Sequence, residues 1–214
     1  MMSAALALAL RGKGHEVGLL DLDFTSPSTH VILGIEGLQP TEDKGIVPPK
    51  AHGLRFMSIV YYAADEPVPL RGADVSNAII ELMAITRWGR LDYLIIDMPP
   101  GLGDATLDLI RLIRVIKFLV VTTPSIVAFE TVKKLIALLL ELHVPVLGVA
   151  ENMVMKPAGV IQKKVEDIGM NYLGQLGYDP DLEVSIGDVT GFKKTRFMMD
   201  VKKIAEEIER LTAS

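Results

Sequence analysis

Short, continuously apolar runs alternate along this chain with longer segments of helical periodicity, and this alternation limits the possible folds more than any other feature. The runs Leu94-Ile95-Ile96 and Leu119-Val120-Val121 show the pattern. Strands without polar alternation must be covered on both faces, and strands separated by helices form βαβ units around a mostly parallel sheet. We therefore predict an α/β fold with a mostly parallel sheet and helices on both faces.

The predicted elements follow from the same periodicities. Strands are expected at residues 16–20, 54–60, 93–97, 118–122, 146–150 and 172–175. Apolar residues spaced by three and four predict helices around residues 75–83, 132–139 and 201–211. The Ala-Leu run at residues 4–10 predicts a buried helix that ends in a turn at Gly12-Lys13-Gly14. The Gly- and Pro-rich segment 34–69 is longer than a usual connection, so we interpret it as either a functional loop or a local excursion.

Composition excludes several classes of protein. The 214 residues suit one globular domain, residues 1–214. The chain has no cysteine, which excludes disulfides, thiolate zinc sites and thiol nucleophiles and favours a cytoplasmic protein. A net charge of -5 argues against binding to duplex nucleic acid. Apolar runs fall short of the roughly 20 residues that span a bilayer, so no membrane partner is expected.

Polar residues gather where the predicted strands end. The first strand is followed by Asp21-Leu22-Asp23, the third ends at Asp97 and runs into Pro99-Pro100-Gly101, and the fifth is followed by Glu151-Asn152. Ligands bind at the carboxyl ends of the strands in open parallel sheets. Each of these residues could also be only a turn former.

Chemistry suggests a role for each of these residues. Asp97 suits a water-mediated magnesium ion beside a phosphate, because magnesium needs only one or two carboxylates. Gly101 could bring a backbone N–H close to a terminal phosphate. Asp23 could orient an attacking water. Asp21 lies further inside the strand end and could support Asp23. Asn152 could read a base or simply cap a turn.

The same segments carry a resemblance to a known family. It rests on residues 3–28, 45–49, 52–59, 71–72, 88–101, 122–124 and 149–153, of which the stretch from Trp88-Gly89 to Pro99-Pro100-Gly101 is the most specific. Together they resemble the Mrp/ApbC family of P-loop ATPases, a branch of the MinD/ParA-like class of dimeric ATPases that is associated with carrying iron–sulfur clusters. This resemblance implies a P-loop NTPase fold, ATP and magnesium as cofactors, ATP/ADP as ligands, a homodimer, and metal-cluster assembly or acceptor proteins as partners.

The resemblance also implies roles for individual residues. They are Asp23 as the switch I carboxylate and a water-mediated magnesium contact, Asp97 as the Walker B aspartate, Gly101 as part of switch II, and Asn152, Asp179 and Pro180 around the adenine. Asp21, from its position beside Asp23, is counted with the nucleotide-binding residues.

Two departures from the family pattern qualify these roles. The first strand and its Walker A loop are absent, since Met1-Met2 stands just after the place of the loop. We favour a native protein with roughly 15 to 40 further upstream residues, and the rival is a natural pseudo-ATPase. Residues 154–159 replace the Cys-x-x-Cys pair of cluster-carrying members, so this chain is expected to bind no iron–sulfur cluster.

The leading hypothesis is therefore an ATP-binding protein of the Mrp type, a dimeric nucleotide switch linked to iron–sulfur cluster assembly. Magnesium-dependent ATP hydrolysis is expected only with the upstream Walker A loop. The alternatives are a catalytically inactive docking or regulatory module and a MinD/ParA-like positioning ATPase.

Overall fold

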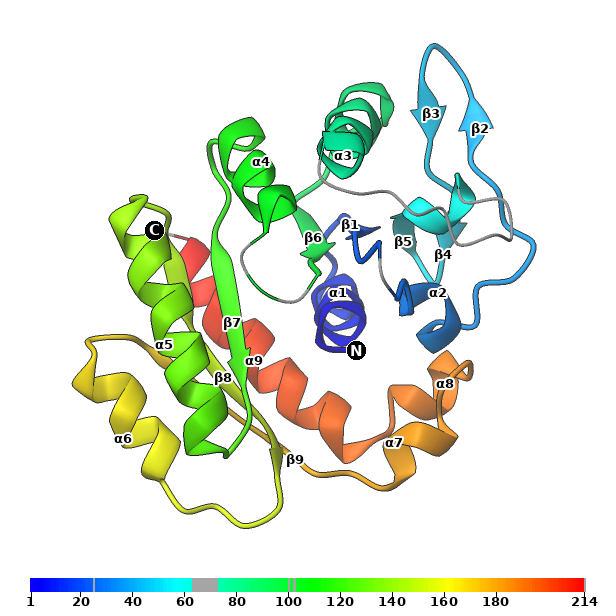
Figure 1. Ribbon diagram of the computed structural model, residues 1–214. Coiled ribbons are helices and arrows are strands. Elements are labelled where there is room, and N and C mark those ends of the chain that lie inside the picture. The colour runs from blue at the N-terminus through cyan, green and yellow to red at the C-terminus, as the bar shows by residue number, and fades with distance from the viewer. Residues whose placement is uncertain (25, 63–72, 100, 102, 214) are drawn as a thin grey trace. The chain divides into compact units, whose positions relative to one another are not determined.

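The computed structural model describes the chain except residues 25, 63–72, 100, 102 and 214, and except the side chains of residues 73, 104 and 105 (Figure 1). The chain forms two compact units. The first unit comprises residues 1–112 and 185–191, and the second unit comprises residues 113–184 and 192–214.

The first unit contains a four-stranded sheet in the order β4-β5-β1-β6. Its strands are β1 (Val17–Asp21), β4 (Lys50–Ala51), β5 (Leu54–Ser58) and β6 (Tyr93–Asp97). β1 lies in the middle and pairs in parallel with both β5 and β6, whereas the short β4 is antiparallel to β5. The parallel pairs place the carboxyl ends of β5, β1 and β6 at one edge of the sheet.

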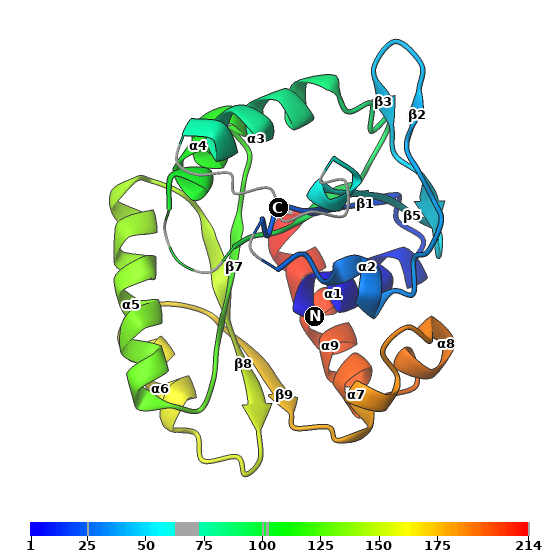
Figure 2. The ribbon, with the colours of Figure 1, turned by 45° about the vertical axis from the view of Figure 1, so that its right-hand side comes forward.

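Helices lie on both sides of this sheet. α1 (Met2–Gly12) lies on one side of the strands, and α3 (Ala73–Ile85) packs with α4 (Asp104–Leu112) on the other (Figures 1 and 2). Every residue from 4 to 10 in α1 is at most 5% exposed, so the predicted buried helix is confirmed. α1 ends at Gly12, and Gly14 takes φ +100°, which confirms the predicted turn.

The segment 34–69 contributes a small antiparallel hairpin. The hairpin consists of β2 (Thr41–Glu42) and β3 (Ile46–Val47). The predicted strand 54–60 ends at Ser58, because the Ser58 hydroxyl accepts a hydrogen bond from the Val60 N–H and the chain continues as a 3-10 turn (η1, Ile59–Tyr61). The short helix α2 (Thr29–Ile32) precedes this segment, and α8 (Val189–Phe192) comes late in the chain.

The second unit contains a three-stranded parallel sheet in the order β7-β8-β9. Its strands are β7 (Phe118–Thr122), β8 (Val146–Val154) and β9 (Tyr172–Gly177). α5 (Ile126–Glu141) and α6 (Val160–Asp167) cover one face, and α9 (Arg196–Thr212) covers the other (Figure 1). A short helix, α7 (Asp181–Val184), follows β9. All six predicted strands are thus present.

α9 carries the apolar stripe predicted near the C-terminus. Val201, Ile204 and Ile208 are at most 4% exposed, and the helix packs against β8 and β9. This confirms that the stripe packs on a sheet. Within the described part of the chain, each helix is too short or too polar to cross a membrane.

Each sheet ends on a strand that is only partly covered. All five residues of β6 are half-buried, and β7 mixes buried, half-buried and exposed residues, whereas all five residues of β1 are buried. Among the described residues, β6 and β7 each pair with a strand on one edge only. Parallel strands are normally buried on both faces. β6 and β7 are therefore covered less completely than β1.

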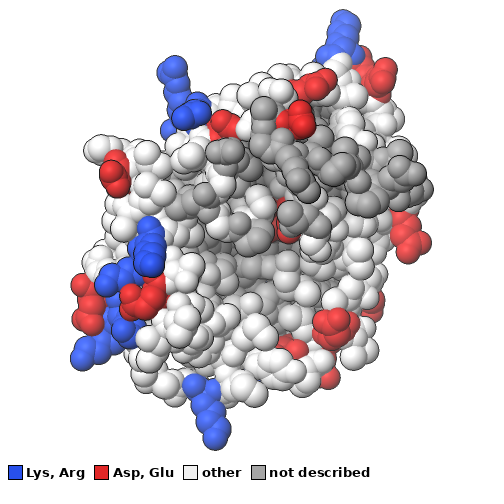
Figure 3. All heavy atoms as spheres, in the orientation of Figure 1, with Lys and Arg blue, Asp and Glu red and all other residues white. Residues whose placement is uncertain are grey.

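Charge is divided unevenly between the units. The first unit has 15 acidic and 9 basic residues, and the second unit has 12 acidic and 13 basic residues. Figure 3 shows basic side chains gathered with acidic ones over α5 and α6, where Lys164 lies 3.9 Å from Glu130. The acidic excess therefore belongs to the first unit.

Candidate functional site

The carboxyl ends of β1 and β6 bring two predicted site residues side by side. Asp21 and Asp97 are direct partners in the parallel register of these strands. One residue further, the Leu22 N–H donates to the Asp97 carbonyl oxygen over 2.9 Å, so the backbone of the β1 end stays attached to β6. Asp23 follows immediately. The acidic residues of the two strand ends therefore share one edge of the first unit.

Asp21 acts as an anchor for the loop that follows β1. Its side chain is fully buried, and its Oδ2 accepts the Thr29 hydroxyl at 2.6 Å and the Thr29 N–H at 3.2 Å. Its Oδ1 accepts the Asp23 N–H at 3.1 Å. Burial raises the pKa of Asp21, the bonds from Thr29 and Asp23 oppose that shift, and the charge of Asp97 adds to it. Asp21 thus ties α2 and Asp23 to the strand end.

Asp23 lies at the surface end of this anchor. Its side chain is half-buried, and its Oδ1 accepts the Ser26 N–H at 3.2 Å. Phe24 and Thr25 lie between Asp23 and Ser26, and Thr25 is outside the described residues. The Asp23 N–H is therefore held by the Asp21 carboxylate, and the Asp23 carboxylate is oriented by the Ser26 N–H.

Ser3 is a site residue that sequence reasoning missed. Its hydroxyl donates to Oδ1 of Asp97 over 2.5 Å. The contact arises because the first turn of α1 ends beside the carboxyl edge of β6. The only signal in the sequence was a hydroxyl residue at the start of an otherwise apolar helix, and 94 positions separate the two partners.

Gly101 follows β6 on a turn with a left-handed backbone. Its φ is +88°, a conformation that favours glycine, and a Cβ at this position would meet no atom within 4 Å. The Thr106 hydroxyl lies 3.4 Å from its carbonyl oxygen. Pro100 and Leu102, the neighbours of Gly101, lie outside the described residues. The exposed glycine backbone leaves room for a close approach by a ligand.

The other predicted site residues lie in the second unit. Asn152 stands near the end of β8, and its Oδ1 accepts the Met153 N–H over 2.9 Å. Met153 has φ +62°, which is rare for a residue with a side chain. The Tyr178 N–H donates to the Val154 carbonyl over 3.0 Å, so the ends of β8 and β9 lie together.

Asp179 and Pro180 follow the end of β9. The Asp179 carboxylate accepts the Asp181 N–H at 3.1 Å through Oδ1 and the Phe197 N–H at 3.0 Å through Oδ2. It thus binds backbone donors in the first turns of both α7 and α9. The side chain of Asp179 has a structural role here, and its part in binding a nucleotide stays a prediction.

A buried carboxylate also lies next to Asn152. Glu151 is 7% exposed, and its Oε2 accepts the Tyr172 hydroxyl over 2.8 Å. Burial, followed by the hydrogen bond and charge of Glu151, raises the pKa of Tyr172 well above its ordinary value. This pair joins β8 to β9 at the residue that precedes Asn152, the predicted base-binding residue.

The donor chemistry of the first unit fits magnesium better than other metals. Carboxylate and hydroxyl oxygens are available at Asp97, Asp23 and Ser3, and magnesium keeps most of its waters. Among the described residues, no group of three or more His, Cys, Asp and Glu side chains could hold a metal ion directly. An iron–sulfur cluster needs thiolate ligands, and the sequence contains no cysteine, so the residues of this chain do not fit a cluster.

Comparison with known proteins agrees with this geometry. Residues 1–210 match the family described as ParA, NUBPL iron-transfer P-loop NTPase. An iron-sulfur cluster carrier protein of Aquifex aeolicus is 35% identical over 197 residues, which cover 85% of this chain and 54% of that protein. A second carrier, from Pseudomonas fragi, is also covered over 54% of its length. The chain thus spans about half the length of these curated relatives.

Solved structures show the same fold. A nucleotide-binding protein from Archaeoglobus fulgidus, in complex with ADP, is 27% identical and superposes with a TM-score of 0.73, covering 90% of this chain and 81% of that one. The cell division ATPase MinD of Pyrococcus furiosus is 19% identical, with a TM-score of 0.73 and 99% of this chain and 92% of that chain covered. The predicted α/β fold of the MinD/ParA-like P-loop NTPase type is confirmed.

Proposed function

The chain belongs to the NUBPL iron-transfer family of ParA-type P-loop NTPases, and from that premise we propose that it is an ATP-binding protein of the Mrp type. In this proposal it acts as a dimeric nucleotide switch in iron–sulfur cluster assembly. The resemblance to the Mrp/ApbC family is confirmed by the family match and by the iron-sulfur cluster carrier relatives.

One observation carries the proposal. Asp21 and Asp97 are in register at the carboxyl ends of neighbouring parallel strands, with Asp23 two residues beyond. A nucleotide phosphate with its magnesium ion binds at such an edge in open α/β sheets. The ADP in the Archaeoglobus relative supports the choice of a nucleotide.

The residues of the first unit divide the work between them. Asp97 and Ser3 would hold magnesium, which when bound neutralises charge on the phosphate oxygens. Asp23 orients the attacking water through its carboxylate. Asp21 keeps Asp23 in place through the hydrogen bond to the Asp23 N–H. Gly101 offers a backbone N–H to a phosphate oxygen.

The base is proposed to bind through residues of the second unit. Asn152 holds its amide by accepting the Met153 N–H, so that its Nδ2 group is available to donate to a base. Asp179 and Pro180 would line the opposite side of the base. Here the Asp179 carboxylate acts indirectly, by fixing the first turns of α7 and α9.

A cluster would be cargo and not a resident group of this chain. Without cysteine the chain supplies no thiolate, so a partner or acceptor protein would ligate the cluster. Reconstitution of the purified chain with iron and sulfide is expected to give no visible cluster absorbance. A stoichiometric cluster would contradict this part of the proposal.

The test of function is ATP turnover with and without a Walker A segment. A version extended upstream of Met1 by such a segment is expected to hydrolyse ATP only with magnesium, and the chain beginning at Met1 is expected to bind ATP weakly. Asp23→Ala and Asp97→Ala in the extended version should abolish turnover. Glu36→Gln, a change at an exposed position of the first unit, is the matched control. Retained turnover in both Asp variants would refute these roles.

A docking module is the second candidate function. Exposed apolar side chains near the ends of β7 and β8 favour it, among them Val127 and Met155, both 78% exposed. Such a module would fold stably without nucleotide and would copurify with an intact P-loop ATPase. A MinD-like positioning ATPase has less support, because the apolar stripe of α9 packs on its own sheet.

A further inference from the structure

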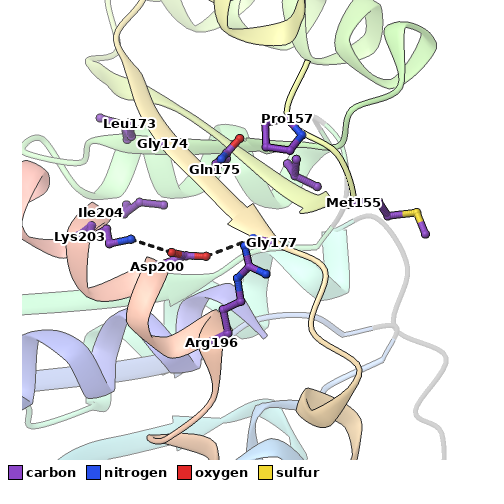
Figure 4. Close-up of a pocket in the computed structure, with 11 residues that line it drawn as sticks. Met155, Pro157, Leu173, Gly174, Gln175, Gly177, Arg196, Asp200, Lys203 and Ile204 are labelled. Atoms are coloured by element: carbon purple, nitrogen blue, oxygen red, sulfur yellow. Dashed lines mark hydrogen bonds and ion pairs between the residues drawn. The ribbon is translucent and has the colours of Figure 1, made fainter. Parts of the chain in front are cut away.

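A pocket of about 330 Å³ lies between β9 and α9, entirely within the second unit (Figure 4). The end of β8 and the turn after it, which include Val154, Met155 and Pro157, form its third wall. This volume is at the lower end of the range for small-molecule sites. The residues proposed to bind the nucleotide do not line this pocket, which we call the β9–α9 pocket.

One face of α9 lines the pocket with charged side chains. Arg196, Asp200 and Lys203 follow each other along consecutive turns of the helix. Asp200 is 15% exposed at its side chain, and it accepts the Lys203 ammonium at 3.0 Å and the Gly177 N–H at 3.3 Å. Asp200 therefore neutralises Lys203 and fastens α9 to the end of β9.

Arg196 supplies the remaining positive charge. Figure 4 shows its side chain reaching from α9 to Gly177. A Cβ at Gly177 would lie 3.2 Å from the guanidinium carbon, so the absence of a side chain there lets the guanidinium lie against the strand backbone. Within the described part of the chain, no ion pair or hydrogen bond occupies this guanidinium. Its planar set of N–H donors suits a carboxylate.

The floor of the pocket is apolar. Val154, Leu173 and Ile204 are at most 7% exposed, so they form a fixed surface, and Met155 stands at the rim with 78% of its surface exposed. Gln175 adds one polar amide from β9. An occupant would therefore combine an anionic head with an apolar body.

The charge of the lining selects between anions. Two cations and one carboxylate leave one net positive charge. A monoanion matches this charge, whereas a phosphate dianion would bring two negative charges close to Asp200. We propose that the β9–α9 pocket binds a small organic monocarboxylate, with its carboxylate on Arg196 and its apolar part over Leu173 and Ile204. The pocket adjoins the segments that carry Asn152 and Asp179, but neither of these residues lines it.

The proposal is tested by titrating the full chain with sodium octanoate while backbone amide and arginine Nε–H resonances are followed by NMR. Saturable shifts are expected at Gly174, Gln175, Gly177 and Arg196. Inorganic phosphate is the second probe, and it is expected to bind about tenfold more weakly or not at all. Phosphate binding as tightly as octanoate would overturn the choice of a carboxylate.

Single substitutions show whether octanoate binds in the β9–α9 pocket or is only attracted to the positive charge of α9. Arg196→Gln should weaken octanoate binding about tenfold or more, because a charge-assisted pair is lost. Lys202→Gln removes the same charge from an exposed position of α9 and should leave the affinity unchanged. Met155→Ser tests the apolar rim, and a several-fold loss is expected. Octanoate affinity equal in Arg196→Gln and Lys202→Gln would overturn the proposal, as would shifts confined to residues outside the pocket.

Discussion

The carboxyl edges of the two sheets carry the same kinds of residue and use them differently. In the first unit, the strand ends carry Asp21, Asp23 and Asp97, and only Asp21 is fully buried. In the second unit, the carboxylates of Glu151 and Asp179 both accept hydrogen bonds that join one element to another. Acidic residues at strand ends are therefore not equivalent: Asp179 accepts backbone N–H groups through both carboxylate oxygens, whereas Asp97 accepts the Ser3 hydroxyl through Oδ1.

We propose that this difference reflects separate tasks of the two units. The half-buried Asp23 and Asp97 combine access to solvent with fixed backbone positions, which a magnesium-dependent reaction needs. The second unit keeps its carboxylates for its own architecture and carries an arginine-lined pocket in addition. Substitutions that treat corresponding residues of the two units alike should therefore have unlike effects.

The largest difference between equivalent substitutions in the two units is expected in ATP turnover. Asp97→Asn, in the version extended by a Walker A segment, should lower ATP turnover by about 100-fold or more, because the amide no longer carries the charge that attracts magnesium. Asp167→Asn makes the same change at an exposed end of α6 in the second unit and should have no effect. Steady-state phosphate release at saturating magnesium measures both. Equal losses would remove the distinction between the units.

The next contrast concerns stability at the Asp21 anchor. Asp21→Ala leaves the Thr29 hydroxyl and two backbone N–H groups without their acceptor in a buried place. We expect the free energy of unfolding to fall by about 2 to 4 kcal/mol. Thr29→Val removes only the hydroxyl and should cost about half as much. Urea titration followed by circular dichroism gives both values, and a change below about 0.5 kcal/mol for Asp21→Ala would show that the anchor is unimportant.

A third prediction concerns pH and the Tyr172–Glu151 pair. Burial raises the pKa of Tyr172 above 10.0 in the folded state. As the pH rises, the Tyr172 hydroxyl is therefore deprotonated in the unfolded chain before it is deprotonated in the folded one. The contribution of the Tyr172–Glu151 pair to folding stability is complete below pH 10 and is lost as the pH rises beyond it. Tyr172→Phe should cost about 1 to 2 kcal/mol at pH 7. The difference between wild type and Tyr172→Phe should narrow above pH 10, and a constant difference would contradict the raised pKa.

The smallest effect is expected at Asp179. Asp179→Ala removes the acceptor for the Phe197 and Asp181 N–H groups and should destabilise the chain by about 1 kcal/mol, as the loss of a helix cap does. Asp179→Asn keeps one oxygen acceptor but turns its Nδ2 donor toward the other N–H group, so it should recover at most about half of this loss. Thermal unfolding of the two variants makes the comparison. Full recovery by Asp179→Asn would show that only one of the two hydrogen bonds contributes to stability.

Local patterns in the sequence were enough to predict the framework. Continuous apolar runs such as Leu94-Ile95-Ile96 predicted parallel strands, and this run forms β6 although its residues are only half-buried; the stripe on α9 follows helical spacing. Asp21 and Asp97 could be placed at one edge because parallel strands align their carboxyl ends.

Contacts between distant residues could not be predicted in this way. The hydrogen bond from Ser3 to Asp97 depends on where α1 crosses the strands, and sequence periodicity carries no such information. The contact of Asp179 with the first turn of α9 joins residues 18 positions apart in the sequence, with α7 and α8 between them. The β9–α9 pocket depends on Arg196 lying against Gly177, which in the sequence is one arginine and one glycine among many.

The central claim is that Asp23 and Asp97 serve one magnesium–phosphate site in the first unit. The most direct measurement is paramagnetic broadening of amide resonances by Mn²⁺ with ATP, since Mn²⁺ accepts the same oxygen ligands as magnesium, on the version extended by a Walker A segment. Broadening is predicted at Leu22, Asp23, Asp97 and Met98, and it should disappear in Asp97→Asn. The claim would be contradicted if Mn²⁺ with ATP left the amide resonances of these four residues sharp. It would also be contradicted if their broadening persisted unchanged in Asp97→Asn.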